Sequence, residues 1–165
     1  MFDDLLAANR RYASKFALKG LTARAAKGFG LVTCMDSRID PLAMLGIKPG
    51  DAKILRTAGG RVTPDVLRSL VLATSFLGVT DIAVIHHTGC ALAETTDDEI
   101  LGHLPDEQRR HLDGAALLAM PDPDAALAED VTAIRSYAAL PSGIRIEGWR
   151  YDVETGLVAR LIPSG

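Results

Sequence analysis

The chain has 165 residues, of which 48% are hydrophobic and 24% are charged, and its formal net charge is -3. This is the composition of a globular domain, and it excludes both a disordered tail and a membrane protein. The slightly acidic balance lacks the basic surface that nucleic-acid binding requires, so we expect no nucleic-acid partner. The length suits one hydrophobic core, so we expect a single domain over residues 1–165.

The N-terminal residues are acidic, and they lack the basic segment and the long apolar segment of a signal peptide. No stretch reaches the roughly 20 apolar residues that are needed to cross a bilayer. We therefore expect a cytoplasmic protein with no membrane partner. In a reducing compartment the two cysteines favour metal binding or catalysis over a disulfide, although the sequence alone leaves a disulfide open.

The first expected element is an amphipathic helix over residues 4–16. Leu5, Leu6, Tyr12 and Phe16 recur at helical spacing, and basic side chains occupy the other side. A helix placed ahead of the sheet has to pack either on its own domain or on another subunit. The sequence leaves both alternatives open.

Short apolar runs predict strands, and threonine or aspartate caps followed by proline or acidic residues predict helices. The expected strands cover residues 28–33, 52–55, 81–85, 144–149 and 157–162. The expected helices cover residues 40–44, 63–78, a segment that starts at 95, and 122–138, while residues 106–113 are expected to form a solvated face or a loop.

The order of these elements predicts how the strands pair. A strand, a helix and a strand between residues 52 and 85 imply a right-handed crossover and therefore a parallel pair. The last two strands are joined by a turn and predict a hairpin at the sheet edge. We expect an α/β fold with a central, mostly parallel sheet of about four strands plus an edge strand, and with helices on both faces.

Metal-binding side chains follow two of the apolar strands. Cys34 ends the first, and His87 and Cys90 end the strand of residues 81–85 and its turn. Two thiolates and one imidazole suit Zn²⁺, and three protein ligands leave a fourth position open, as in catalytic zinc sites. The alternative is that both cysteines are buried as small hydrophobic residues. His103 and His111 could in principle close a site, but they lie far along the chain.

Two further groups flank this set of ligands. Asp36 and Arg38 are two residues apart, so in an extended chain they point the same way and can form a two-pronged pair. An ordinary structural ion pair is the alternative. His86 faces the opposite side of its strand from His87, so we expect a packed histidine rather than a ligand.

The Cys-x-Asp-x-Arg motif of residues 34–38, followed by the His-x-x-Cys motif of residues 87–90, resembles the motif pair of the β-class carbonic anhydrases. Residues 56–60 resemble that family's Arg-Asn-Ala-Gly segment, and the likeness runs from about Asn9 to the C-terminal strand. The resemblance implies one Zn²⁺ per chain and the reversible hydration of CO₂ to bicarbonate by zinc-bound hydroxide. It also implies a homodimer or higher even oligomer, with the N-terminal helix (about residues 4–18) at the dimer interface.

The same resemblance assigns catalytic roles to Asp36 and Arg38. It implies two states for Asp36, which is either held by Arg38, leaving water on the zinc, or turned inward as a fourth metal ligand beside Cys34, His87 and Cys90. The sequence does not distinguish these states.

The chain departs from the family pattern at three positions near the expected site. Gly89 stands where many relatives carry an acidic residue, Ala91 stands where they carry glycine, and Thr57 replaces the usual asparagine. These changes leave the pocket shape and the substrate open. The alternatives to CO₂ hydration are hydrolysis of carbonyl sulfide or carbon disulfide at the same site, and a catalytically silent zinc-binding or bicarbonate-binding protein.

Overall fold

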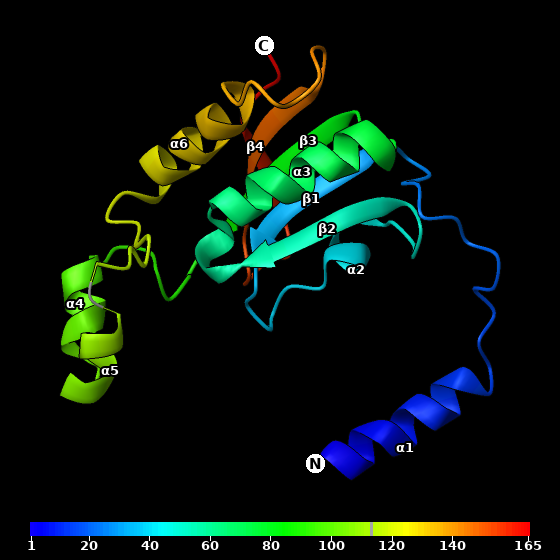
Figure 1. Cartoon of the computed structure of the whole chain (residues 1–165), viewed down its shortest axis with the longest axis horizontal. Helices are drawn as coiled ribbons and strands as arrows, with labels where there is room; N and C mark the ends of the chain where they lie inside the picture. The colour runs from blue at the N-terminus through cyan, green and yellow to red at the C-terminus, as the bar shows by residue number, and fades with distance from the viewer. Residues whose placement is uncertain (113) are drawn as a thin grey trace.

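The computed structural model describes residues 1–112 and 114–165 and contains a five-stranded sheet with the strand order β2-β1-β3-β4-β5 (Figure 1). β1 pairs in parallel with β2 and β3, β3 pairs in parallel with β4, and β5 adds to β4 in antiparallel orientation at the edge. The strands are β1 (Phe29–Cys34), β2 (Ala52–Thr57), β3 (Asp81–His87), β4 (Arg145–Tyr151) and β5 (Val158–Ile162). The predicted fold class, with four parallel strands and an antiparallel edge strand, is confirmed.

Helices cover both faces of this sheet, as predicted. The helical elements are α1 (Phe2–Ala13), α2 (Pro41–Leu45), the 3₁₀ turn η1 (Ala58–Gly60), α3 (Pro64–Phe76), α4 (Asp97–Gly102), α5 (Asp106–His111) and α6 (Pro123–Arg135). α3 and α6 lie on one face, and the short α2 lies on the other (Figure 1). The predicted cap signals act as expected, because the side chains of Thr63 and Asp122 accept hydrogen bonds from the first turns of α3 and α6.

The central strands are apolar because both of their faces are covered. On the α3 and α6 side, Val32 and Val84 pack with Leu70 and Val131 in one buried cluster. On the other side, Leu31 packs with neighbouring strand residues against the partly buried side chains of α2. This two-sided core fixes β1 and β3 side by side, and their C-terminal ends are where the expected metal ligands emerge.

Local expectations differ from the structure in the segment of α5 and at the end of α6. Residues 106–111 form the short helix α5 rather than a loop, although all of their side chains are exposed, so the expected solvated face is correct. Residue 113, the end of that expected segment, lies outside the described residues. α6 ends at Arg135 rather than near residue 138, so Tyr137, expected on its buried side, is 38% exposed.

α1 stands apart from the sheet (Figure 1), and none of its residues, all of which are described, is buried. Its large apolar side chains are exposed, Phe2 at 77%, Leu5 at 60% and Tyr12 at 58%. The alternative that this helix packs on its own domain is therefore not what the structure has. Among the described residues, no helix combines the length and the apolar character that a membrane span requires.

Candidate metal centre

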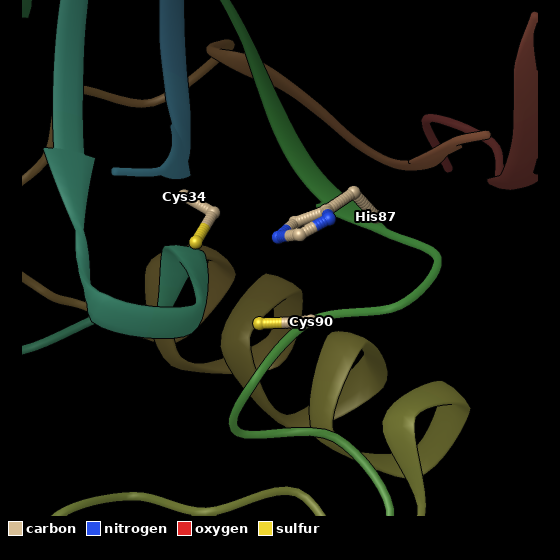
Figure 2. Close-up of side chains that lie close together, drawn as sticks. All are labelled: Cys34, His87 and Cys90. Carbon is tan, nitrogen blue, oxygen red and sulfur yellow. The ribbon is translucent and has the colours of Figure 1, made fainter. Parts of the chain in front are cut away.

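The predicted metal ligands meet at the C-terminal edge of the sheet. Cys34 is the last residue of β1, His87 is the last residue of β3, and Cys90 lies in the turn that follows β3. All three are buried, and one donor atom from each lies within 4.8 Å of the other two. Figure 2 shows the two sulfur atoms and the imidazole pointing toward one another. Both cysteines are free thiols, so the disulfide alternative is not what the structure has.

The imidazole of His87 is oriented as a metal ligand requires. Its Nδ1 lies 2.9 Å from the carbonyl oxygen of Thr88, and because a carbonyl only accepts, Nδ1 must carry the hydrogen. Nε2 then holds a free lone pair, and it is buried with no hydrogen-bond partner among the described residues. A backbone hydrogen bond that fixes the tautomer in this way is the usual support for a ligating histidine.

The side chains of Cys34, Cys90 and His87 shift one another's pKa values. The hydrogen bond with Cys90 lowers the pKa of Cys34 to about 4, against an opposing effect of burial. The same hydrogen bond raises the pKa of Cys90, and burial adds to that rise. Burial lowers the pKa of His87, but Cys34 more than offsets this, so the pKa of His87 is raised overall. Without a metal, negative charge therefore gathers on Cys34 while Cys90 keeps its proton. Two sulfurs and one imidazole nitrogen are nevertheless a donor set that fits Zn²⁺, and binding would release the remaining proton.

Asp36 and Arg38 form the predicted two-pronged pair at the edge of this cluster. Arg38 donates from Nε to Oδ1 of Asp36 at 3.0 Å and from Nη2 to Oδ2 at 2.7 Å. Its backbone N–H also donates to Oδ1 at 2.9 Å. The side chain of Arg38, followed by its backbone N–H, holds the pKa of Asp36 well below its usual range. Oδ2 lies 3.9 Å from Nε2 of His87, so the carboxylate borders the metal-ligand cluster without being one of its three mutually close members.

Backbone groups that the sequence analysis did not assign complete this arrangement. Arg38 also donates from Nη2 to the carbonyl oxygen of Gly89 at 2.8 Å, which ties the Asp36 pair to the turn that carries Cys90. Arg56 donates to the carbonyl oxygens of Cys34 at 3.0 Å and Asp36 at 2.6 Å. The guanidinium of Arg56 therefore holds the loop backbone, while that of Arg38 holds the carboxylate of Asp36.

The glycine pair of residues 59 and 60 permits a close approach of two backbones. Gly60 has φ of +74°, and a Cβ atom there would lie 3.1 Å from the backbone nitrogen of Cys34. Gly60 therefore serves both a turn and a close approach to the backbone of Cys34. At the neighbouring position, the hydroxyl of Thr57 donates to the carbonyl oxygen of Arg61 at 2.9 Å, so this departure from the family pattern closes the same turn.

A cavity of about 380 Å³ opens beside Cys34 and Cys90. Its lining combines the charged Asp36 and Arg38 with apolar atoms of Met35, Ala58 and Leu92, among other residues. Ala91, the second departure from the family pattern, also lines this cavity. The arrangement offers a small, largely apolar space, with the Asp36–Arg38 ion pair at one edge, next to Cys34 and Cys90.

His86 is a packed histidine, as expected, and it lies in a buried polar network that the sequence analysis missed. Its Nε2 is 3.0 Å from Oδ2 of Asp130, and Arg61 donates to the same oxygen at 2.8 Å. The signal for Asp130 was its position, because it lies on the same helical face as Leu127 and Ile134, where an apolar residue would be expected.

Comparisons with known proteins agree with this geometry. The sequence profile of the family described as "Carbonic anhydrase" matches residues 29–120. Beta-carbonic anhydrase 1 of Mycobacterium tuberculosis is 38% identical over 168 aligned positions, which cover 98% of this chain and 98% of that protein. A carbon disulfide hydrolase of Acidianus sp. is 33% identical over 148 positions, which cover 76% of this chain and 72% of that protein.

The same relationship holds in three dimensions. The crystal structure of the carbonic anhydrase from Streptococcus mutans superposes with a TM-score of 0.86 at 36% sequence identity, covering 96% of each chain. The family that the motif pair predicted is thus confirmed over nearly the whole chain, and the chain belongs to the β-carbonic anhydrase family of enzymes.

Proposed function

We propose that this enzyme catalyses the zinc-dependent, reversible hydration of CO₂ to bicarbonate and a proton. The observation that carries the proposal is the buried cluster of two thiols and one imidazole beside a carboxylate held by arginine. We propose one Zn²⁺ per chain, held by Cys34, His87 and Cys90. A bound Zn²⁺ would act as a Lewis acid that makes water a nucleophile at neutral pH.

The chain's own residues would position the reactants around that centre. An ionised carboxylate only accepts hydrogen bonds, so Asp36 would orient a reactant that carries an O–H group and disfavour a bare anionic oxygen. Arg38 keeps Asp36 on the cavity side by holding both of its oxygens. The apolar atoms of Met35, Ala58 and Leu92 suit a small substrate without charge and limit the access of bulk water. In this arrangement Asp36 is paired with Arg38, so Cys34, His87 and Cys90 alone would hold a bound Zn²⁺.

The test combines metal analysis with stopped-flow CO₂ hydration on the purified enzyme. We expect about one zinc per chain and measurable hydration in the wild type. Cys90→Ser should lose most of both, because a serine hydroxyl is a far poorer zinc ligand than a thiolate. His111→Asn is the matched control, because this exposed histidine on α5 should leave both unchanged. Full zinc occupancy in Cys90→Ser would contradict the ligand assignment.

A second candidate function is hydrolysis of carbon disulfide or carbonyl sulfide at the same site. It is favoured by the similarity to the carbon disulfide hydrolase of Acidianus sp.. Release of H₂S from either substrate, without CO₂ hydration, would establish this alternative. A full complement of zinc with neither activity across the pH range would instead indicate a zinc-binding or bicarbonate-binding protein without turnover.

We also propose that two chains form a homodimer, or a higher even oligomer, in which α1 packs on the neighbouring subunit. An isolated helix of about 12 residues is marginal in water, and α1 leaves its apolar face exposed. The sheet face opposite α3 and α6 carries the stacked rings of Phe29 and Trp149, which are only partly buried, and offers a complementary apolar surface. A cytoplasmic location, consistent with two free thiols, stays a prediction.

Sedimentation of the double variant Leu5→Ala/Tyr12→Ala tests this assembly. The two side chains are seven residues apart and lie on one helical face, so their removal should weaken the dimer about tenfold or more. Arg10→Ala/Arg11→Ala changes two exposed basic residues of the same helix and should sediment like the wild type. A wild-type protein that sediments as a monomer at micromolar concentration, with full activity, would refute the assembly.

A further inference from the structure

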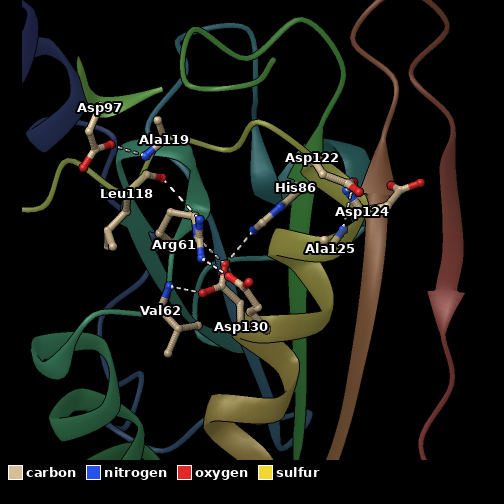
Figure 3. A network of polar contacts seen from close by, with 11 residues as sticks. Arg61, Val62, His86, Asp97, Leu118, Ala119, Asp122, Asp124, Ala125 and Asp130 are labelled. Carbon is tan, nitrogen blue, oxygen red and sulfur yellow. Dashed lines mark hydrogen bonds and ion pairs between the residues drawn. The ribbon is translucent and has the colours of Figure 1, made fainter. Parts of the chain in front are cut away.

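Asp130 is a buried carboxylate with three hydrogen-bond donors from outside its own helix. It is 3% exposed on the inward face of α6. Oδ2 accepts from Nε of Arg61 at 2.8 Å and from Nε2 of His86 at 3.0 Å, and Oδ1 accepts from the backbone N–H of Val62 at 3.0 Å. Figure 3 shows these contacts converging on one carboxylate from two separate segments of the chain.

Arg61 extends the same network to a third segment. It is 8% exposed, and it donates from Nη1 to the carbonyl oxygen of Leu118 at 3.3 Å and from Nη2 to Glu129 at 3.2 Å. Leu118 has a positive φ of 61°, which is uncommon for a residue other than glycine. A buried ion pair with these additional bonds specifies one arrangement of the groups around it, although it adds little net stability.

This network lies directly behind the metal-ligand cluster. The parallel register pairs Thr33 with Ile85, so one residue further along, Cys34 and His86 are neighbours on adjacent strands and on the same face. Gly60 lies between them, because a Cβ there would be 3.1 Å from the nitrogen of Cys34 and 3.4 Å from Cδ2 of His86. Asp130 thus binds His86, the cross-strand neighbour of Cys34, and also the two residues that follow Gly60.

The sequence positions of the bonded groups make the coupling direct. His86 immediately precedes the ligand His87 at the end of β3. Arg61 and Val62 immediately follow η1, whose residues Ala58 and Gly59 line the cavity. A displacement of the Asp130 carboxylate would therefore be transmitted to a metal-ligand strand and to the cavity wall at the same time.

We propose that Asp130 is a positioning residue for the metal centre, acting through His86 and through the Arg61–Val62 backbone. The inference rests on the proposed zinc site, and it assigns Asp130 no contact with substrate or metal. His86 is a donor to Asp130 through Nε2, so its ring serves as a spacer that sets β3 against α6. Arg61 balances the buried charge and keeps the carboxylate in one orientation.

The test uses Asp130→Asn in the zinc-loaded and cobalt-substituted protein. Asparagine is nearly isosteric but has only one side-chain oxygen. If that oxygen faces Arg61 and His86, the NH₂ group meets the N–H of Val62, and in the other orientation it meets Arg61 and His86, so the network has to rearrange either way. We expect zinc to be released to a chromophoric chelator about tenfold faster or more, the range seen when groups supporting metal ligands are removed. We also expect the sulfur-to-cobalt charge-transfer and d–d absorption bands to shift, because these bands report the geometry of the ligands themselves.

Glu129→Gln is the matched control on the same helix. It removes the negative charge of Glu129, a side chain that is 71% exposed and pairs with Arg61, and it leaves all three bonds to Asp130 in place. Its cobalt spectrum and zinc release should match those of the wild type. If Glu129→Gln behaves like Asp130→Asn, the effect comes from the Arg61 charge rather than from Asp130, and the proposal is overturned.

Three further outcomes complete the test. A folded Asp130→Asn protein with the wild-type cobalt spectrum and zinc-release rate, and only a lower melting temperature, would reduce Asp130 to a packing residue and overturn the proposal. If Asp130→Asn does not fold, His86→Gln replaces it, since glutamine can still donate to Asp130 but lacks the rigid ring. A wild-type spectrum in His86→Gln would also overturn the proposal, whereas wild-type protein that binds no metal at all would refute the proposed zinc site instead.

Discussion

Gly60→Ala should damage both the fold and the metal site, because Gly60 combines an unfavourable backbone conformation with a contact that cannot relax. Its φ of +74° lies in the left-handed region, which costs an L-residue roughly 1–2 kcal/mol. The new methyl group would also lie 3.1 Å from the nitrogen of Cys34 and 3.2 Å from the carbonyl carbon of Thr33. These are backbone atoms of a central strand, and overpacking of this kind adds about 1–3 kcal/mol.

Gly156→Ala separates the energetic cost of the close contact from the cost of the left-handed backbone conformation. Gly156 has nearly the same φ, +73°, but nothing lies within 4 Å of a Cβ placed there. Both variants lose the same entropy in the unfolded chain, so the difference between them measures the contact. We expect urea unfolding to give a loss of about 2–5 kcal/mol for Gly60→Ala and about 1–2 kcal/mol for Gly156→Ala.

The metal readout adds a second, independent comparison. In Gly60→Ala the backbone of Cys34 has to move, so zinc should be released to a chelator faster than from Gly156→Ala at a temperature where both are folded. Equal unfolding free energies and equal zinc-release rates for the two variants would refute the view that residues 59 and 60 serve a close backbone approach at the first ligand.

Three further predictions follow from other contacts. Arg38→Ala should lower kcat/KM for CO₂ hydration by about 100-fold with zinc retained, because Asp36 loses its two-pronged partner. Arg68→Ala, which changes an exposed arginine of α3, is the control. Wild-type turnover in Arg38→Ala would show that the Asp36–Arg38 pair is merely structural. Backbone N–H groups of Ala119 and Leu117 lower the pKa of Asp97, so Asp97 stabilises the base of the α4–α5 segment above the unfolded pKa of about 3.9, and this contribution is lost as the pH falls through the lower, folded pKa. Hydrogen exchange at those two amides should therefore be protected at pH 7 and lose protection in acid. The two amides donate to different oxygens of Asp97, and asparagine has only one, so at least one amide should lack protection in Asp97→Asn at pH 7, while Asp98→Asn should match the wild type. Wild-type protection of both amides in Asp97→Asn would contradict the assignment. Gly148→Ala should lower the free energy of urea unfolding by about 1–3 kcal/mol, because its Cβ would lie 3.0 Å from side chains of Val131 and Ile162. Gly102→Ala, with nothing within 4 Å of its Cβ, should be neutral or stabilising. A neutral Gly148→Ala would show that these core side chains move aside at little cost.

The elements that sequence reasoning found are those with local causes. The cap and proline at Thr63 and Pro64 fix the start of α3, and the apolar runs of β1 and β3 identify strands covered on both faces. The proximity of Cys34, His87 and Cys90 was predictable for a topological reason, because the C-terminal ends of parallel strands meet at one edge of the sheet. The ends of elements were less predictable, as α6 shows, because tertiary contacts decide where the last turn stops.

The network around Asp130 was not predictable in the same way. Arg61 and Asp130 are 69 residues apart, and the pairing of buried charges depends on which helix covers which strand. The carbonyl group of Gly89, which receives a hydrogen bond from Arg38, carries no side-chain signal at all. Such backbone acceptors can be identified only from the fold, which places the turn after β3 beside the loop after β1.

Zinc-edge X-ray absorption on the purified, active enzyme tests the central assignment most directly. Ligation by Cys34, His87 and Cys90 predicts two sulfur neighbours at about 2.3 Å and a nitrogen shell at about 2.0–2.1 Å, with a further light atom completing four-coordination. The same spectrum should lose one sulfur neighbour in Cys90→Ser whenever that variant holds zinc at all. A metal shell of nitrogen and oxygen atoms only, in an enzyme that hydrates CO₂ at the wild-type rate, would contradict the assignment.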